Sequence, residues 1–448
     1  DLRRGAPGVQ PPGWPAIVHI EANWPSDDAA LGADALLAEL LVTLPAYPYS
    51  LEERLTAIRR RLLLDGVPPE LKRFAPVLAI QCFLNEYAWA ADADERAAVE
   101  RMAADLPSLG DDELMMLACY RPLCDVPGAE TLPQRGWKGR AAVVLEDQLL
   151  AVQADRALAP TIPALTPITA GSDEVRGQYE ANPYPRWRVA TRIPVETSIK
   201  GVPLPPGPDV LFAGCGTGLH AIQAGQRYGP NARILAIDLS RASLAYGTRK
   251  ARQYGLTHIQ FAQADLLELD SLGRDFDAIE SSGVLHHLDD PFAGARLLAR
   301  RLRPGGLMKL GLYSRTARER WAAAKALART FGPDEIPQMR RAIATAPADD
   351  PVRGALSSTD FYASSAARDL LMHVREHELD IADLQRIVDE TGLTFLGFVL
   401  PSSTLQAYRA AWPDDHRGVK LENWAAFERA NPRTFVSMYQ FWLHRPQG

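Results

Sequence analysis

The sequence predicts a Rossmann-like α/β fold, in which helices cover both faces of a mostly parallel sheet. Three observations support this prediction. A short apolar run at residues 210–213 leads into a turn with Gly214, Gly216 and Gly218, and a helical pattern follows. Four more strand-like runs come later in the chain, with helical segments between the early ones. Polar residues stand where several of these runs end, at the edge where parallel sheets bind ligands.

The glycine-rich turn at residues 214–218 allows main-chain N–H groups to touch a ligand, because glycines place no side chain between them. A dinucleotide fingerprint, G-x-G-x-x-G, would need its third glycine at position 219, where this chain has Leu219. A phosphate-binding loop would need a lysine, and this turn has none. The remaining pattern, G-x-G-x-G, resembles motif I of the class I methyltransferases that use S-adenosylmethionine (SAM). Two late strand-like runs, at 394–399 and 438–444, would then complete a seven-stranded sheet of order 3-2-1-4-5-7-6.

Two aspartates end the second and third strand-like runs. Asp238 follows the run 233–237, where an acidic side chain would hold the ribose hydroxyls of a nucleoside. Asp265 follows the run 259–264 and is placed to accept a hydrogen bond from an adenine amino group. We therefore expect SAM as cofactor, S-adenosylhomocysteine (SAH) as product, and no metal. The expected cofactor-binding residues are Gly214, Cys215, Gly216, Gly218, Asp238, Leu239, Asp265, Leu266, Ser281 and Arg186.

A proline-ordered stretch, QYEANPYPRW at 178–187, precedes the first strand. Its prolines favour an extended chain, which predicts a stiff rim over the carboxyl edge of the sheet. Arg186 is expected to pair with the methionyl carboxylate of SAM. Tyr184 or Trp187 is expected to face the sulfonium or an incoming amine through a cation–π contact. The alternative is a proline-ordered surface staple without a ligand.

The chain is long enough for more than one core, since single cores rarely exceed about 300 residues. Residues 1–165 predict an all-helical N-terminal domain, followed by a linker rich in Pro and Thr. Residues 166–314 predict the SAM-binding core, and residues 315–378 predict a helical cap inserted after the fifth strand. Residues 379–448 would complete the core with its last helix and strands 6 and 7.

Several stretches carry a resemblance that covers the whole chain: QCFLNEYAWA at 81–90, QYEANPYPRW at 178–187, LFAGCGTG at 211–218, DLSRASLAY at 238–246, GVLHHLDDP at 283–291, VREHELDI at 374–381 and MYQFW at 438–442. They resemble a bacterial family of SAM methyltransferases, some members of which carry upstream tetratricopeptide repeats. The chain is also similar to the rickettsial enzymes that methylate lysines of an outer membrane protein. The common class I motif has an aspartate two places before the first glycine, where this chain has Phe212. The acidic contact to the methionyl amine is therefore expected from another residue or not at all.

Methyl transfer from a sulfonium is an in-line displacement, which needs the acceptor atom about 3 Å from the methyl group and water excluded. A lysine acceptor must first lose a proton from an ammonium of pKa about 10.4, and an apolar aromatic mouth would lower that pKa. Glu180, His286 and His287 are candidate proton acceptors, although the two histidines are also placed to close the adenosine pocket. The expected catalytic residues are Tyr184, Trp187, Glu180 and His286, and the expected substrate-binding residues are Tyr179, Asn182 and His287.

Three functions remain open at this point. The favoured one is a protein methyltransferase that acts on lysine or another side chain and grips its partner with the N-terminal helices. The second is a small-molecule O-, N- or C-methyltransferase whose cap encloses the substrate. The third is a SAM-binding module without turnover. A deep cavity between residues 315–375 and the sheet would favour a small substrate, and an open groove would favour a polypeptide.

Composition and charge argue against other classes of protein, such as nucleic-acid-binding and membrane-spanning proteins. The net charge of −6 gives no electrostatic footprint for nucleic acid, and no apolar run reaches the roughly 20 residues of a membrane span. The four cysteines lack disulfide or zinc spacing, and we expect a cytoplasmic protein. HVREH at 373–377 has the spacing of a zinc-peptidase motif, and we interpret it as histidines at a helix end beside the cap. The helical regions offer surfaces for a homodimer.

Overall fold

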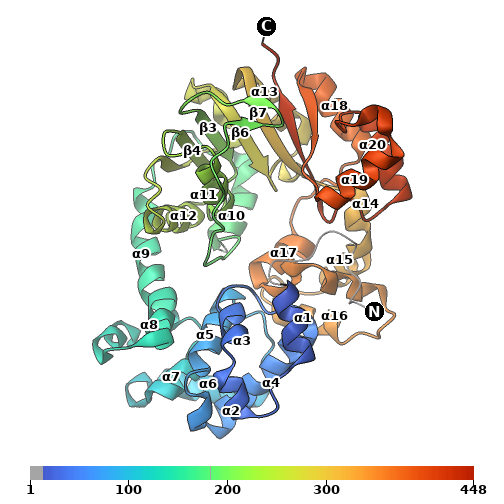
Figure 1. Cartoon of the computed structure of the whole chain (residues 1–448). Coiled ribbons are helices and arrows are strands. Elements are labelled where there is room, and N and C mark those ends of the chain that lie inside the picture. Colours follow the sequence, from blue (N-terminus) through green and yellow to red (C-terminus); the bar gives the residue numbers. More distant parts are fainter. Residues whose placement is uncertain (1–13, 182, 448) are drawn as a thin grey trace.

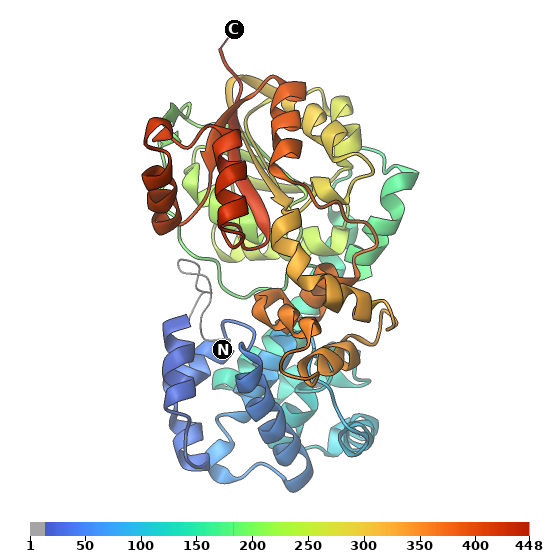
Figure 2. The same cartoon turned by 90° about the vertical axis from the view of Figure 1, so that its right-hand side faces the viewer.

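The computed structural model describes residues 14–181 and 183–447 of the chain. Figure 1 shows an upper lobe built on a sheet and a lower lobe built from helices, with the helices of residues 322–372 between them. The turned view in Figure 2 places the same orange helices against both lobes. The sheet lobe therefore meets the N-terminal helices partly through these helices, which follow the fifth core strand, and partly directly, as in the ion pair of Arg249 with Asp155.

The main sheet has the order β5-β4-β3-β6-β7-β9-β8. The five strands from β3 to β7 are parallel, and β9 runs antiparallel to both of its neighbours. Counted along the core, this order is 3-2-1-4-5-7-6, so the predicted Rossmann-like fold is confirmed. The strands are β3 (Asp209–Ala213), β4 (Arg233–Asp238), β5 (Ile259–Gln263), β6 (Phe276–Ser282), β7 (Leu302–Tyr313), β8 (Thr394–Phe398) and β9 (Met438–His444).

Strand β7 begins earlier than the sequence predicts. The apolar run begins at Leu307 and predicts a strand from there, whereas the structure pairs Leu302 with Phe276 and then shifts register before Ala278. The first residues of this strand are not recognised from apolar runs, because the segment 303–306 contains two glycines, which weaken the strand pattern.

Helices cover both faces of this sheet, as its apolar strands require. Ile222 and Leu244 belong to the core on one face, and Leu298 and Leu384 belong to the core on the other. Helix α19 was not predicted from the sequence. The helices are α11 (Leu219–Arg227) and α12 (Arg241–Gln253) on the first face, and α13 (Pro291–Arg300), α18 (Ile381–Thr391), α19 (Ser402–Ala411) and α20 (Leu421–Ala430) on the second.

The N-terminal helical region is also present as predicted. Its core is a separate cluster that includes Leu55, Leu78 and Leu117. The sequence pattern over 69–89 predicts one helix, but the structure divides it, because Pro69 and Pro76 each stand in the first turn of a separate helical segment. The helices are α1 (Trp14–Ala22), α2 (Asp28–Ala33), α3 (Ala35–Leu41), α4 (Tyr49–Asp65), α5 (Ala75–Leu84), α6 (Ala93–Ala104), α7 (Asp111–Ala118), α8 (Gly139–Leu145) and α9 (Ala151–Leu158).

The cap, residues 315–378, forms its own small core around Trp321, Met339 and Phe361. It is tied to the N-terminal helices by a buried ion pair, in which Arg340 lies 2.6 Å from Glu52. Its last helix leads back to the carboxyl edge of the sheet. The helices are α14 (Arg315–Arg318), α15 (Ala322–Ala328), α16 (Ile336–Ala344) and α17 (Ser364–Met372).

The segment between the lobes is ordered by the sheet rather than loose. Leu165 donates to the carbonyl of Gln263, whose own N–H donates to Pro163, so the linker runs beside β5. Helix α10 (Asp173–Ala181) and a small ribbon of β1 (Ser198–Ile199) and β2 (Val202–Pro203) follow. Of the helices in the described part of the chain, none is long and apolar enough to span a bilayer.

Candidate cofactor and acceptor site

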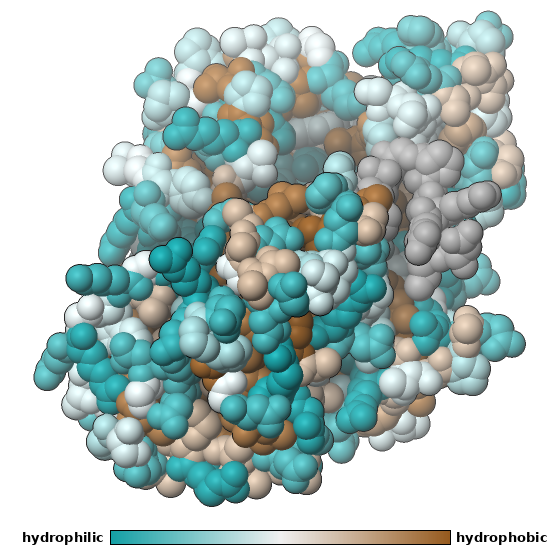
Figure 3. Space-filling model, turned by 60° about the horizontal axis from the view of Figure 1, so that its bottom comes forward, coloured by the Kyte–Doolittle hydropathy of each residue, from teal (hydrophilic) through white to brown (hydrophobic). Residues whose placement is uncertain are grey.

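A cavity of about 540 Å³ lies at the carboxyl ends of the parallel strands, where the cap and helix α10 cover the sheet. Viewed from below, the surface is hollowed between the two lobes (Figure 3). Many residues that the sequence singled out come together here, from both strand ends and the rim. Those that line the cavity are Tyr179, Tyr184, Gly214, Cys215, Gly216, Asp238, Leu239, Asp265, Leu266 and His287.

The glycine turn lies directly under the rim. Gly216 has a φ of +52°, and a Cβ on it would come within 2.5 Å of the carbonyl oxygen of Tyr184. The N–H of Thr217 donates to that same carbonyl across 3.2 Å. The close approach requires glycine at 216, and it holds Tyr184 over the end of β3.

Asp238 is fixed at the end of β4 by two main-chain donors. Its Oδ2 accepts from the N–H of Gly216 at 2.8 Å, and its Oδ1 accepts from the N–H of Ser240 at 3.0 Å. Desolvation raises the pKa of Asp238 above its usual value, although these hydrogen bonds oppose the shift. Each carboxylate oxygen can accept a second hydrogen bond, so a pair of ribose hydroxyls fits here.

Asp265 is buried at the end of β5 and is held by the linker. Its Oδ2 accepts from the N–H and the hydroxyl of Thr169, at 3.0 and 2.7 Å, and its Oδ1 accepts from the N–H of Leu267 at 2.9 Å. One acceptor position at Oδ1 remains for a donor such as an adenine amine. Sequence reasoning missed Thr169, because its contact joins segments far apart in the chain.

The other end of the cavity, which we call the acceptor end, is formed by α10, β7 and the cap. Asp369 of α17 accepts hydrogen bonds from Tyr179 at 2.7 Å and from Tyr313 at 2.9 Å. The ring of Tyr184 is stacked 6.5 Å from that of Tyr179, and Asp360 lines the same end. Three tyrosines and two carboxylates therefore meet beyond the glycine turn.

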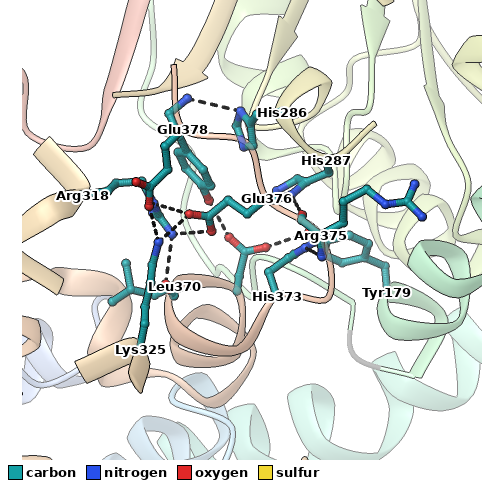
Figure 4. A network of polar contacts seen from close by, with 12 residues as sticks. Tyr179, His286, His287, Arg318, Lys325, Leu370, His373, Arg375, Glu376 and Glu378 are labelled. Atoms are coloured by element: carbon teal, nitrogen blue, oxygen red, sulfur yellow. Dashed lines mark hydrogen bonds and ion pairs between the residues drawn. The ribbon is translucent and has the colours of Figure 1, made fainter. Parts of the chain in front are cut away.

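The carboxylates of the acceptor end lack cationic partners. Among the described residues, neither Asp360 nor Asp369 forms an ion pair, whereas Arg318 and Lys325 pair with Glu376 and Glu378 (Figure 4). Desolvation, and then the nearby Asp369, raises the pKa of Asp360 to about 6. The acceptor end thus presents two carboxyl groups without ion-pair partners in the described part of the chain, and it suits a cationic group.

His287 and His373 stack at the same end, with ring centroids 3.6 Å apart. The Nδ1 of His287 lies 2.7 Å from the carbonyl of Arg375, so it carries the proton and leaves Nε2 as a lone pair. That Nε2 is buried without a hydrogen-bond partner among the described residues. Desolvation lowers the pKa of both histidines, that of His373 to about 4, so both are neutral at pH 7.

His287, Asp369 and His373 each place a potential ligand atom within 4.8 Å of the others. Their geometry does not suit a shared ion, because the two rings are nearly parallel, 17° apart, and their lone pairs lie in separate planes. The Nδ1 of His373 already accepts from the N–H of Arg375 at 3.1 Å. In the zinc-like motif, Glu376 is bound to Arg318 instead. We therefore interpret this cluster as a hydrogen-bonded network, and the absence of a metal stays a prediction.

The structure corrects the expected role of Arg186, which does not line the cavity. Its guanidinium lies 4.1 Å from the ring centroid of Phe83 and 3.6 Å from the carboxylate of Glu86. The rim therefore turns this side chain toward helix α5 and away from the cofactor end. Local sequence could not reveal this direction, since both partners lie in the N-terminal helices.

Trp187, expected to face the sulfonium or an incoming amine, and Glu180, expected as a proton acceptor, also lie outside the cavity. Trp187 is buried, donates to the carbonyl of Thr217 at 3.3 Å, and packs edge to face with Tyr246. Glu180 is exposed and lies 3.4 Å from the N–H of Ala242, which donates to it.

Three further expectations are corrected by burial, and one lies beyond the structure. His286 is fully buried beneath the site, stacked 3.7 Å from Tyr313. Ser281 donates to the carbonyl of Ala213, and Gly218 faces Phe261 in the core, so these residues support the loop without lining the cavity. The predicted substrate residue Asn182 lies outside the described residues.

Comparison with known proteins identifies the core. Residues 210–306 match the family described as "Methyltransferase domain". This part of the chain is a class I methyltransferase domain. Its topology and its adenosine-compatible strand ends agree with that assignment.

Relatives of the methyltransferase domain are diverse. The chain is 32% identical over 202 residues to an uncharacterised protein of Synechococcus sp., covering 43% of this chain and 48% of that protein. It is 36% identical over 128 residues to trans-aconitate 2-methyltransferase of Deinococcus radiodurans, covering 28% of this chain and 45% of that enzyme. The chain thus spans about half the length of these curated relatives. Among solved structures, it is similar to PKMT2 from Rickettsia typhi in complex with AdoHcy, with 17% identity, a TM-score of 0.42, and coverage of 54% of this chain and 50% of that one.

Proposed function

We propose that the protein is a SAM-dependent methyltransferase that transfers a methyl group to the nitrogen of a protein side chain, with lysine as the favoured acceptor. The single observation that supports this best is a continuous cavity, in which Asp238 and the glycine turn lie at one end and Asp369 at the other. The first end fits an adenosyl group, and the second fits an amine that enters from the cap side.

The charge of the acceptor end favours an amine over an acidic acceptor. An ammonium would find the carboxylates of Asp360 and Asp369, with which no described cation forms an ion pair, and the ring of Tyr184. Cation–π contacts and carboxylates both favour positive charge, whereas a carboxylate acceptor would be repelled. A slender lysine side chain also suits a site enclosed by side chains.

When bound, SAM would supply an electrophilic methyl group on its sulfonium. The chain's own residues would then orient the amine and exclude water. The Nε2 lone pair of His287 is free to take a proton from the ammonium, so that the nitrogen can attack. Tyr179 and Tyr313 hold Asp369 in place, and Asp369 would steady the amine during its approach. The methylated nitrogen becomes cationic again, which the same carboxylates favour.

A small-molecule amine is the second candidate. The cavity lies between the cap residues 360–375 and the sheet, which is the arrangement that favours an enclosed small substrate. A SAM-binding module without turnover is the third candidate, and the free Nε2 of His287 beside the carboxyl groups of the acceptor end counts against it.

The test is transfer of label from methyl-labelled SAM in a cell lysate, for the unmodified protein and for Asp369→Asn. We expect label in a protein band, at an amine nitrogen, and much less label with the variant. Label confined to the small-molecule fraction would favour the second candidate. No label in either fraction, despite SAH binding by the same preparation, would leave the third.

A further inference from the structure

The lining of the cavity also includes a group of cationic side chains, which we call the cationic lobe. His220 of α11, Arg227 of α11 and Lys309 of β7 line it and surround the buried Glu280 of β6. His220 Nε2 lies 2.9 Å from a Glu280 oxygen, Lys309 Nζ lies 3.6 Å from the same oxygen, and Arg227 Nη1 lies 3.5 Å from the other. Neither the binding of adenosine nor the binding of the methyl acceptor, as described above, gives these side chains a role.

The cations of the lobe face two carboxylates, the buried Glu280 and the more exposed Glu196. Burial alone would raise the pKa of Glu280, but His220, Lys309 and Arg227 outweigh it and lower that pKa, so the carboxylate is ionised. Arg227 is shared with Glu196, which lies 3.8 Å from its Nε, whereas the ion pair of Lys309 is with Glu280. Lys309 lines the cavity and, among the described residues, has one ion-pair partner, at 3.6 Å, so it favours an anion in the cavity beside it.

Phe212 adds no charge beside the cationic side chains of the lobe. It stands in β3 two places before Gly214, and its register partner on β6 is Glu280. Its ring packs edge to face with His220, with centroids 5.4 Å apart. An apolar ring at this position places no negative charge between the glycine turn and the cations. Arg186, the cation that the sequence offered for an anionic ligand group, is turned away to Glu86.

We propose that His220 and Lys309 bind the α-carboxylate of the methionyl part of SAM and SAH. This inference rests on the proposed function, since it requires a SAM-like ligand in the cavity. His220 stands in the first turn of α11, directly after the glycine turn, and Lys309 points into the same cavity from β7. The carboxylate would have Lys309 as its ion partner, and His220 would donate to it from Nδ1, since its Nε2 faces Glu280.

Calorimetry with two probes tests this assignment: SAH, which carries the amino acid part, and 5′-methylthioadenosine, which lacks it. We expect Lys309→Met and His220→Gln each to weaken SAH binding by about tenfold or more, since hydrogen bonds to charged groups are this strong. Binding of 5′-methylthioadenosine should change by less than about threefold. Lys309→Arg should keep most of the SAH affinity. Lys72→Met, which removes an exposed cation of the N-terminal helices, should change neither.

The outcomes separate this inference from the proposed function. If the unmodified protein binds neither probe, the proposed function fails. If it binds both probes and the two variants bind SAH as tightly as the unmodified protein, the assignment of the carboxylate is overturned. Equal losses for both probes would also overturn it, because a contact to the carboxylate cannot weaken a ligand that lacks one. The two variants test the assignment separately, so if one unfolds, the same comparison of SAH with 5′-methylthioadenosine is made with the other.

Discussion

Tyr313 donates a hydrogen bond to Asp369 across 2.9 Å, which ties the end of β7 to helix α17 of the cap. The sheet and the cap therefore share a buried polar contact at the acceptor end. Asp369 accepts a second tyrosine hydroxyl from α10, so three segments of the chain converge on one carboxylate.

Loss of the charge of Asp369 is expected to affect turnover and spare cofactor binding. In Asp369→Asn the side chain keeps its shape, but an amide holds an ammonium less well than a carboxylate does. We expect kcat/KM for the identified acceptor to fall by about tenfold to a hundredfold, with SAH affinity unchanged within about threefold. Asp349→Asn, at an exposed position of the cap, is the control and should leave both unchanged. Normal turnover of the Asp369 variant would refute the role of this carboxylate.

Asp360 is expected to make stability depend on pH. Its pKa is raised from the ordinary 3.8 to about 6, so the folded state holds this proton more tightly than the unfolded state. The stabilisation is therefore complete below about pH 4 and is lost as the pH rises to about 6. Urea unfolding of the unmodified protein and of Asp360→Asn measures it as a difference. We expect the difference to change by at most about 3 kcal/mol over this window, and a flat difference would contradict the raised pKa.

The buried pair of Glu52 and Arg340 is expected to hold the cap on the N-terminal helices. Arg340→Met leaves Glu52 buried without its partner, which should destabilise the protein by about 3–5 kcal/mol. Arg61→Met breaks an ion pair of Arg61 with Asp28 that is far more exposed, and it should cost about 1 kcal/mol or less. Thermal unfolding compares the two variants. Similar small losses in both would show that the buried pair does not hold the cap.

Gly216 is expected to be required for its close contact and not only for its backbone conformation. In Gly216→Ala the new methyl group would meet the carbonyl oxygen of Tyr184, and SAH affinity should fall by more than about tenfold. Gly255 also has a positive φ, of +68°, but open space around it. Gly255→Ala should thus cost about 1–2 kcal/mol of stability and keep SAH binding. Equal SAH affinity in the two variants would contradict the role of the contact.

The strands and their order could be predicted because each strand of a parallel sheet is a short apolar run with its own end signal. Asp238 and Asp265 follow such runs directly, so their place at the carboxyl edge follows from the local pattern. The bounds of helix α18 could also be predicted from the sequence, because Asp380 caps its start and Gly392 ends it with a positive φ. These features depend on residues close together in the chain.

The residues that were missed or misplaced depend on distant partners. Arg186 turns toward Phe83 and Glu86 of the N-terminal helices, which no local pattern around the rim reveals. Asp369 was missed because an aspartate on an amphipathic helix has the pattern of a solvated face, whereas the cap buries it against Tyr179 and Tyr313.

The most direct test of the account is calorimetric titration of SAH into the unmodified protein and into Asp238→Ala. We expect clear uptake of SAH by the unmodified protein, and an affinity lower by about tenfold to a hundredfold in the variant, because the ribose loses a charged acceptor. Circular dichroism checks that both proteins are folded. Absence of SAH uptake by folded unmodified protein, or equal affinity in the variant, would contradict the central claim that an adenosyl group is held at the ends of β3 and β4.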